Sequence, residues 1–225
     1  MPIEHSFNPY GDSSGGSTLA IAGKDFAILA GDTRHSTGYS IDSRNESQIH
    51  SVGDGLLVSP NGFSADARAF VDDVHNDIIW YHHKHNKKLA ISSCARSIMH
   101  TLYRRRFFPY YVSPILVGIE PDGTGAVYSF DPVGSYEREA SRAAGHASEL
   151  LVPFLDNQVR KANQVDPETG KPLAQHDLDL ETALQLVKDA FAGAAERRIQ
   201  VGDWLEIAVV TKDGHKVERY PLRRD

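Results

Sequence analysis

The sequence predicts an α+β protein in which two packed sheets are covered on each outer side by helices, a four-layer sandwich. Short apolar runs typical of strands occur in three groups along the chain, and pairs of helical patterns separate these groups. In addition, 40% of the 225 residues are hydrophobic, which is enough for a sizeable core. Two pairs of amphipathic helices need two sheet faces to cover, and the four-layer arrangement buries all of their apolar stripes.

The first group of strands is a hairpin. Residues 18–22 and 26–30 are apolar runs on either side of the turn-forming residues 23–25, and the second run leads into Asp32-Thr33-Arg34. Neither run alternates with polar residues, so we expect both strands to be covered on both faces.

A polar stretch and a third strand come before the first pair of helices. Residues 35–51 are largely polar with room for short strands, and the apolar run 56–59 ends at the turn sequence 60–62. Ser64 is placed to cap the next helix. Apolar residues then recur at spacings of three and four in two segments, which predicts two antiparallel helices on one sheet face. These residues are Phe70, Val74, Ile78 and Tyr81, then Ile91, Ala95, Ile98 and Leu102.

The second half of the chain repeats the order of strands and helices. Residues 115–119 and 126–130 are expected to form a hairpin, and 148–159 a helix that Pro153 distorts. Residues 163–175 are rich in polar and turn residues, which is typical of an exposed loop.

A fourth helix and a last hairpin complete the pattern. Asp179 is expected to cap a helix with the clearest apolar periodicity in the chain. Its periodic residues are Leu180, Leu184, Val187, Phe191 and Ala194. Residues 205–211 and 216–220 then form a hairpin in which Asp213-Gly214 is the expected two-residue turn.

Composition argues against several classes of protein. The net charge of −6 does not suit a nucleic-acid binder, which needs a basic face. Cys94 is the only cysteine, so no internal disulfide can form and a reducing compartment fits best. No window approaches the about 20 apolar residues of a membrane helix. We assign residues 1–14 to an N-terminal extension or propeptide remnant, and 15–225 to a single domain.

Several stretches resemble proteasome β-type subunits. The hairpin contains Gly-Ser-Thr-Leu-Ala at 16–20 and Ala-Gly-Asp-Thr-Arg at 30–34, similar to the opening hairpin of that family. The strings at 105–111, 125–136 and 155–158 are similar to the sixth β position of the eukaryotic 20S particle. The resemblance covers nearly the whole chain. It implies the four-layer αββα sandwich of the N-terminal nucleophile hydrolase type.

The resemblance also implies that the catalytic positions are degenerate. In this family the chain is cut before a threonine whose hydroxyl attacks the peptide carbonyl. That position falls on Gly16, which has no hydroxyl, and the assisting lysine falls on Gln48, which has no charge. The two supporting serines and the later aspartate fall on His146, Val201 and Arg198. Because such groups act as a unit, losing any one would remove most of the rate.

Two polar residues of the hairpin need separate interpretations. Asp32 matches the retained hairpin aspartate, and without a nucleophile we expect it to hold Arg34 and backbone amides. Ser17 offers the alternative function, because a cut after Gly16 would expose it as the amino-terminal nucleophile of an active hydrolase. Against this, Ser17 is one residue out of frame, so its side chain points to the opposite face of the strand. The alternative also lacks a lysine at Gln48.

The expected function is therefore that of a non-catalytic structural β subunit of the 20S proteasome core particle, which supports assembly while active neighbours degrade proteins in an ATP- and ubiquitin-dependent way. The implied partners are the other α and β subunits in stacked seven-membered rings, and unfolded polypeptides in the chamber. No cofactor or metal is implied, and the implied location is cytoplasmic and nuclear. The mature amino terminus is expected a few residues before Phe7, ahead of Gly16.

The resemblance further implies a contact with a neighbour's substrate. Asp131, Pro132 and Val133 match the strand end that lines the substrate cleft of the adjacent active subunit. The carboxylate of Asp131 would then face a cationic substrate side chain. The simpler interpretation is that Asp131 caps the turn before Gly134.

Two remaining clusters have simpler structural interpretations. Among the histidines near the end of the first helix, only His82 and His85 share a helical face, and no cysteine or carboxylate completes a metal site. The basic residues 104–106 suit a helix C-terminus, and the aromatic stretch 107–111 is expected to be buried. Neither a metal ion nor a nucleic acid is expected as a ligand.

Overall fold

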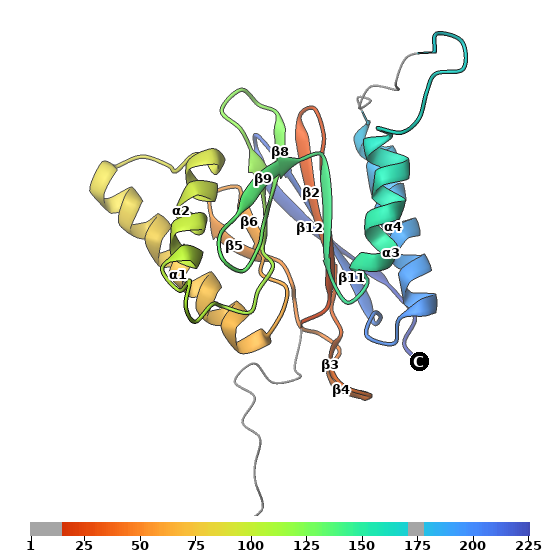
Figure 1. The fold of residues 1–225 in the computed structure, drawn as a ribbon, viewed down its shortest axis with the longest axis horizontal. Helices are drawn as coiled ribbons and strands as arrows, with labels where there is room; N and C mark the ends of the chain where they lie inside the picture. The colour runs from red at the N-terminus through yellow and green to blue at the C-terminus, as the bar shows by residue number, and fades with distance from the viewer. Residues whose placement is uncertain (1–14, 171–177) are drawn as a thin grey trace, which may run out of the picture.

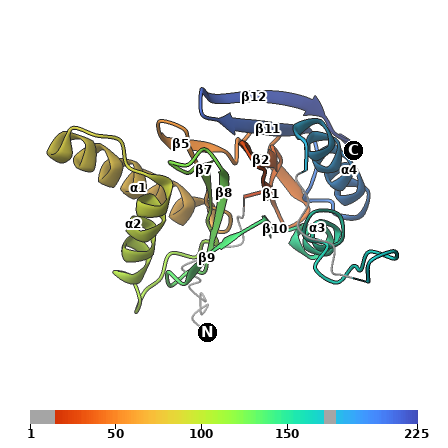
Figure 2. The same ribbon diagram turned by 90° about the horizontal axis from the view of Figure 1, so that it is seen from above.

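Two five-stranded antiparallel sheets lie at the centre of the computed structural model, which describes residues 15–170 and 178–225. Helices α1 (Ser64–His85) and α2 (Ile91–Tyr103) cover one outer side, as Figure 1 shows. Helices α3 (Ser148–Leu155) and α4 (Leu180–Arg197) cover the other, and the view from above in Figure 2 separates the layers. The predicted four-layer sandwich is confirmed.

The first sheet has the predicted hairpin at its centre. Its strands, in spatial order, are β10 (Ser141–Gly145), β1 (Ser17–Ala22), β2 (Phe26–Asp32), β11 (Trp204–Thr211) and β12 (Gly214–Pro221). Every residue of β2 is buried, as predicted, because side chains along a strand point to alternate faces and both faces are covered. Ile28 packs in the core under α3 and α4, whereas Leu29 packs in the core between the sheets.

The second sheet lies under α1 and α2. Its strands, in spatial order, are β5 (His50–Gly53), β6 (Leu56–Ser59), β7 (Ile115–Ile119), β8 (Gly125–Phe130) and β9 (Tyr136–Glu139). A separate two-stranded ribbon, β3 (His35–Thr37) with β4 (Ser40–Ser43), occupies the polar stretch. Strands β9 and β10 were not predicted, because their residues are mostly polar or small and show no apolar alternation. They form by pairing with β8 and β1.

The helices match their apolar patterns, with local differences. Asp179 caps α4 as predicted, since its carboxylate accepts a hydrogen bond from the Thr182 N–H at 2.8 Å. Ser64, by contrast, is the first residue of α1, and Phe63 occupies the cap position without a side-chain bond. The predicted helix over 148–159 ends at Leu155 and continues as a π-helical turn, η1 (Asp156–Arg160). Pro153 has no N–H to donate, which is consistent with the expected distortion.

Two predicted loops can be compared with the structure. The last hairpin turns at Lys212-Asp213, with Thr211 paired to Gly214, so the predicted Asp213-Gly214 turn is wrong by one residue. Gly214 instead begins β12 with a φ of 125°. Residues 163–170 are largely exposed, as predicted, and the rest of that predicted loop, 171–175, lies outside the described residues. Within the described residues, no helix is both long and apolar enough to cross a membrane.

Candidate functional site

The start of β1 lies against the end of β2, and this places Gly16 beside Asp32. The two strands pair with Thr18 opposite Gly31, so the chain entering β1 passes the last residue of β2. The Asp32 carboxylate is fully buried and accepts a hydrogen bond from the Ser17 N–H at 2.6 Å. Its other oxygen accepts a hydrogen bond from the Gly202 N–H at 3.2 Å. The retained aspartate therefore holds backbone amides, as predicted.

Gly16 has no space for a side chain. A Cβ atom at this residue would lie 2.2 Å from Oδ1 of Asp32 and 3.3 Å from the carbonyl oxygen of Arg34. The position that the resemblance gives to the nucleophile is thus filled from the other side by the Asp32 carboxylate. No hydroxyl at residue 16 fits this arrangement unless Asp32 moves.

Gln48 lies beside Gly15, the residue that precedes Gly16. Its side chain is 6% exposed, and its Oε1 would be 2.6 Å from a Cβ atom on Gly15. Its amide donates to the Glu46 carbonyl at 3.4 Å. At the position that the resemblance gives to an assisting lysine, the structure has a neutral amide. The hollow next to Gly15 and Gln48 has a volume of about 30 Å³, which leaves room for little more than a water molecule.

Burial dominates the electrostatics of Asp32. It raises the pKa of this carboxyl to about 7, although the amides of Ser17 and Gly202 and the charge of Arg34 act in the opposite direction. Near neutral pH a large fraction of the Asp32 side chains is therefore protonated. Such a group is a weak electrostatic partner for a cationic amine or lysine.

The side chain of Ser17 is already occupied. Ser17 is fully buried, and its Oγ accepts a hydrogen bond from the Ala147 N–H at 2.9 Å, just before α3. The hydroxyl thus contacts the backbone of another segment, whereas the Ser17 amide contacts Asp32. This geometry agrees with the expectation that the side chain of Ser17 is out of frame for catalysis.

The three remaining positions that the resemblance assigns to catalytic groups lie in the segments next to β1 and β11. Burial lowers the pKa of His146, and the nearby charges of Arg198 and His35 act in the same direction. The guanidinium of Arg198 forms an ion pair with Glu149 on α3. Val201 is buried in the core under α3 and α4, and the next residue donates to Asp32. None of the three offers a hydroxyl or carboxylate to the Gly16 region.

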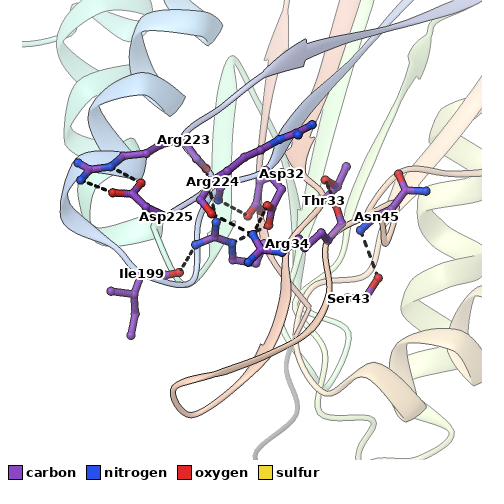
Figure 3. A network of polar contacts seen from close by, with 12 residues as sticks. Asp32, Thr33, Arg34, Ser43, Asn45, Ile199, Arg223, Arg224 and Asp225 are labelled. Carbon is purple, nitrogen blue, oxygen red and sulfur yellow. Dashed lines mark hydrogen bonds and ion pairs between the residues drawn. The ribbon is translucent and has the colours of Figure 1, made fainter.

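A buried ionic network, absent from the sequence-based expectations, supports this region. Arg34 pairs with Asp203 at 2.7 Å and not with Asp32, which corrects the expected partner of Arg34. Arg44 binds the other oxygen of Asp203 at 2.6 Å. Arg34 also donates to the carbonyl of Ile199 at 2.8 Å, and Figure 3 shows this bond beside Asp32. The partners lie far apart in sequence, so no local pattern indicated them.

This network also fixes the C-terminal segment. The Arg223 carbonyl accepts a hydrogen bond from the Asp203 N–H at 2.9 Å and one from Arg34 at 3.4 Å. The Arg224 carbonyl accepts one from Arg44 at 3.0 Å. Burial alone would raise the pKa of Asp203, but hydrogen bonds from Arg34 and Arg44 hold that pKa below its usual value. Asp203 is therefore ionised at neutral pH.

The second predicted site, at the end of β8, is a tight turn beside a hollow. Oδ1 of Asp131 accepts hydrogen bonds from the amides of Val133 at 3.0 Å and Ser135 at 2.8 Å, so Asp131 does cap this turn. A hollow of about 390 Å³ lies beside it and is lined by Asp131 and Pro132, among others, but not by Val133. Its polar lining includes Arg142.

The described residues contain no group of three or more histidine, cysteine, aspartate or glutamate side chains arranged to hold a metal ion. The aromatic stretch after α2 is not wholly buried, contrary to the expectation from the sequence. Phe107 is 96% exposed, whereas Tyr110 is 3% exposed.

Comparison with known proteins gives a family match over most of the chain. A family model described as "Proteasome subunit" matches residues 13–210. Proteasome subunit beta type-6 of Saccharomyces cerevisiae is 57% identical over 229 residues, covering 100% of this chain and 94% of the relative. Probable proteasome subunit beta type-6 of Schizosaccharomyces pombe is 46% identical over 224 residues, covering 99% of each. Proteasome subunit beta type-1 of Danio rerio is 45% identical, covering 100% of this chain and 92% of the relative.

Proposed function

The chain belongs to the proteasome β subunit family, and from this we propose that it occupies the sixth position of the β ring as a subunit without a catalytic centre of its own. Membership of this family means that the chain is a proteasome core subunit, which assembles with other proteasome subunits. The sixth position is supported by the two relatives named beta type-6 and by the strings at 105–111 and 125–136.

The contact between Gly16 and Asp32 carries the proposal of catalytic silence. The residue in the nucleophile's place has no hydroxyl, and the Asp32 carboxylate occupies the space where a side chain would start. Gln48 supplies no charge to assist a nucleophile. Since nucleophile and assisting groups act as a unit, these two losses together leave no route for acyl transfer at residue 16.

The subunit then acts through its contacts. It fills one place in a seven-membered β ring stacked against α rings, and it helps to enclose the chamber in which unfolded polypeptides are cut by active neighbours. The particle that contains it takes part in the ATP- and ubiquitin-dependent degradation of proteins in the cytoplasm and nucleus. Residues 15–225 form the domain, and residues 1–14 form an N-terminal extension. Because the subunit does not cut itself at residue 16, this extension either stays attached or is trimmed by a neighbouring subunit.

The Ser17→Ala variant tests the rival function. We expect assembled particles with this variant to keep all of their peptide-hydrolysing activities, because the Ser17 hydroxyl accepts a hydrogen bond from the Ala147 amide and lies out of frame for catalysis. The variant should be destabilised by about 1–3 kcal/mol, the cost of a buried amide without an acceptor. Peptide hydrolysis of purified particles and urea denaturation of the chain measure the two effects. The exposed Ser51→Ala is the control, and selective loss of one hydrolytic activity in Ser17→Ala alone would support the rival.

The Asp131→Asn variant tests the contact with a neighbour's substrate. The asparagine keeps Oδ1 as the acceptor for Val133 and Ser135 and removes only the charge. A partly solvated carboxylate about 5 Å from a cationic substrate side chain contributes ~0.5–1 kcal/mol. We therefore expect kcat/KM for peptides with a basic residue three places before the cut to fall about two- to five-fold relative to apolar ones at the neighbouring chymotrypsin-like site.

The matched control is Asp122→Asn. Asp122 also caps a turn, accepting from the Thr124 N–H at 2.9 Å, but it lies at the opposite end of β8. Asp122→Asn should leave the ratio of kcat/KM for basic peptides to kcat/KM for apolar peptides unchanged. An unchanged ratio in Asp131→Asn, with normal assembly, would limit Asp131 to its role in the turn.

A further inference from the structure

The last residue of α2 and the segment that follows it keep four aromatic rings in solvent. We call residues 103–111 the aromatic loop. Within it, Phe107 is 96% exposed, Phe108 62%, Tyr103 60% and Tyr111 59%. Isolated exposed aromatic residues are ordinary, but four within nine residues make a concentrated apolar surface of the kind that marks interaction sites.

The aromatic loop is exposed although it is firmly attached to the rest of the fold. Its buried Tyr110 donates a hydrogen bond to Asp73 on α1 at 2.7 Å and packs edge-on against Phe70. The Tyr111 amide donates to Asp66 on α1 at 2.8 Å. The Tyr111 carbonyl accepts from the Phe63 amide at 2.9 Å. The fold thus anchors the loop to the start of α1 while it leaves the other rings in water.

A close backbone approach strengthens this anchor. Gly62, just before α1, has a φ of 118°, and a Cβ atom there would lie 2.3 Å from the Tyr111 carbonyl oxygen. Gly62 also forms an isolated antiparallel bridge with Val112. Any side chain at residue 62 would push the loop away, so Gly62 helps to keep the C-terminal end of the loop in place.

Three arginines lie in the same segment as the exposed rings. Arg104, Arg105 and Arg106 are exposed, and none of them takes part in an ion pair within residues 15–170 and 178–225. Arg105 lies over the Tyr110 ring, 4.2 Å from its centroid, and Arg106 lies 5.8 Å from that of Phe107. Aromatic residues and arginine are the residue types enriched at the centres of protein interfaces.

We infer that the aromatic loop is a docking surface for a neighbouring proteasome subunit that presents clustered Asp or Glu side chains beside apolar ones. Carboxylates are the groups that the guanidinium groups of Arg104, Arg105 and Arg106 would bind best, and an apolar surface is what the exposed rings would bury against. A protein fits better than a nucleic acid because the chain has a net charge of −6 and the basic residues form no extended face. The inference rests on membership of the assembly and is independent of catalytic silence.

A photo-crosslinking amino acid in place of Phe107, in the assembled particle, identifies the partner. We expect a cross-link to one other subunit, within a segment that contains at least two carboxylates. Tyr39, which is 97% exposed but lies on the ribbon between β3 and β4, is the control position. The inference is overturned by cross-links only to residues 1–14 of the same chain, by cross-links to nucleic acid, by the same partner segment from Tyr39, or by no cross-link at all.

Charge reversal then tests the proposed chemistry. The triple variant Arg104→Glu, Arg105→Glu, Arg106→Glu should enter purified particles at least tenfold less than differently tagged wild type in the same cells. Reversing the carboxylates of the cross-linked segment should restore its entry. The control triple variant Lys84→Glu, Lys87→Glu, Lys88→Glu makes the same charge change at the end of α1 and in the turn that follows it. Equal entry of the two triple variants, or failure of the restoring variant, would contradict the inference.

One substitution separates docking from folding. Phe107 is almost fully exposed, so Phe107→Ser should leave urea denaturation of the chain unchanged while it lowers entry into particles several-fold. Normal entry of Phe107→Ser would show that the ring is not at an interface. Because these experiments measure entry and contact but no hydrolysis, their failure would leave the proposal of catalytic silence standing.

Discussion

Asp203→Asn is expected to lower the free energy of unfolding by about 3–5 kcal/mol. The Asp203 carboxylate binds Arg34 at 2.7 Å and Arg44 at 2.6 Å, and the side chains of Asp203 and Arg34 are 1% and 3% exposed. Asparagine keeps the shape but leaves the Arg34 charge buried without its counterion. It also tolerates the left-handed backbone at this position, where φ is 69°, so backbone strain adds little.

Urea denaturation of the dilute chain gives this free energy. The control is Asp54→Asn, which breaks an ion pair with Lys88 whose two side chains are 72% and 75% exposed. Pairs of this kind contribute about 0–1 kcal/mol, so the control should remain close to wild type. A change in Asp203→Asn no larger than that of the control would mean that solvent reaches the network and that it does not hold the C-terminal segment.

Gly16→Thr should destabilise the chain and should not create a protease. The new Cβ would meet Oδ1 of Asp32 at 2.2 Å, and Asp32 is held by the buried amides of Ser17 and Gly202. Overpacking of this kind costs about 1–3 kcal/mol. Even if Asp32 yields, the neutral Gln48 leaves the new hydroxyl without an assisting charge, so we expect no additional peptide hydrolysis by assembled particles.

Gly193→Ala is the matched control. It lies within α4, where a Cβ atom would meet nothing within 4 Å, and alanine favours a helix over glycine by about 1 kcal/mol. We expect this control to be neutral or slightly stabilising. If Gly16→Thr unfolded at the wild-type urea concentration, or if its particles gained a covalently inhibitable activity, the steric argument at residue 16 would be wrong.

Local patterns predicted most of the fold, because strong apolar periodicity and turn residues coincide with its elements. The fourth helix has both a cap at Asp179 and a continuous apolar stripe, and it forms as expected. Strands β9 and β10 were missed because their polar sequence forms strands only through pairing with β8 and β1. Such pairing is decided by tertiary context and not by the propensity of the segment.

The candidate site, like the fold, combines features that the sequence can indicate with features that depend on tertiary contacts. The neighbourhood of Gly16 and Asp32 follows from hairpin register, which a sequence can indicate. The pairing of Arg34 with Asp203, 169 residues apart, leaves no local signal. The exposure of Phe107 was not predicted either, because hydrophobicity alone does not distinguish a core residue from one at an interface.

The most direct test of catalytic silence is the intact mass of this subunit, taken from assembled particles after treatment with an epoxyketone. This reagent bonds to the amine and hydroxyl of an amino-terminal nucleophile. The predicted result is an unmodified chain that begins ahead of Gly16, in particles whose active subunits gain the mass of the reagent. A chain that begins at Gly16 or Ser17, or a reagent adduct on Ser17, would contradict the account.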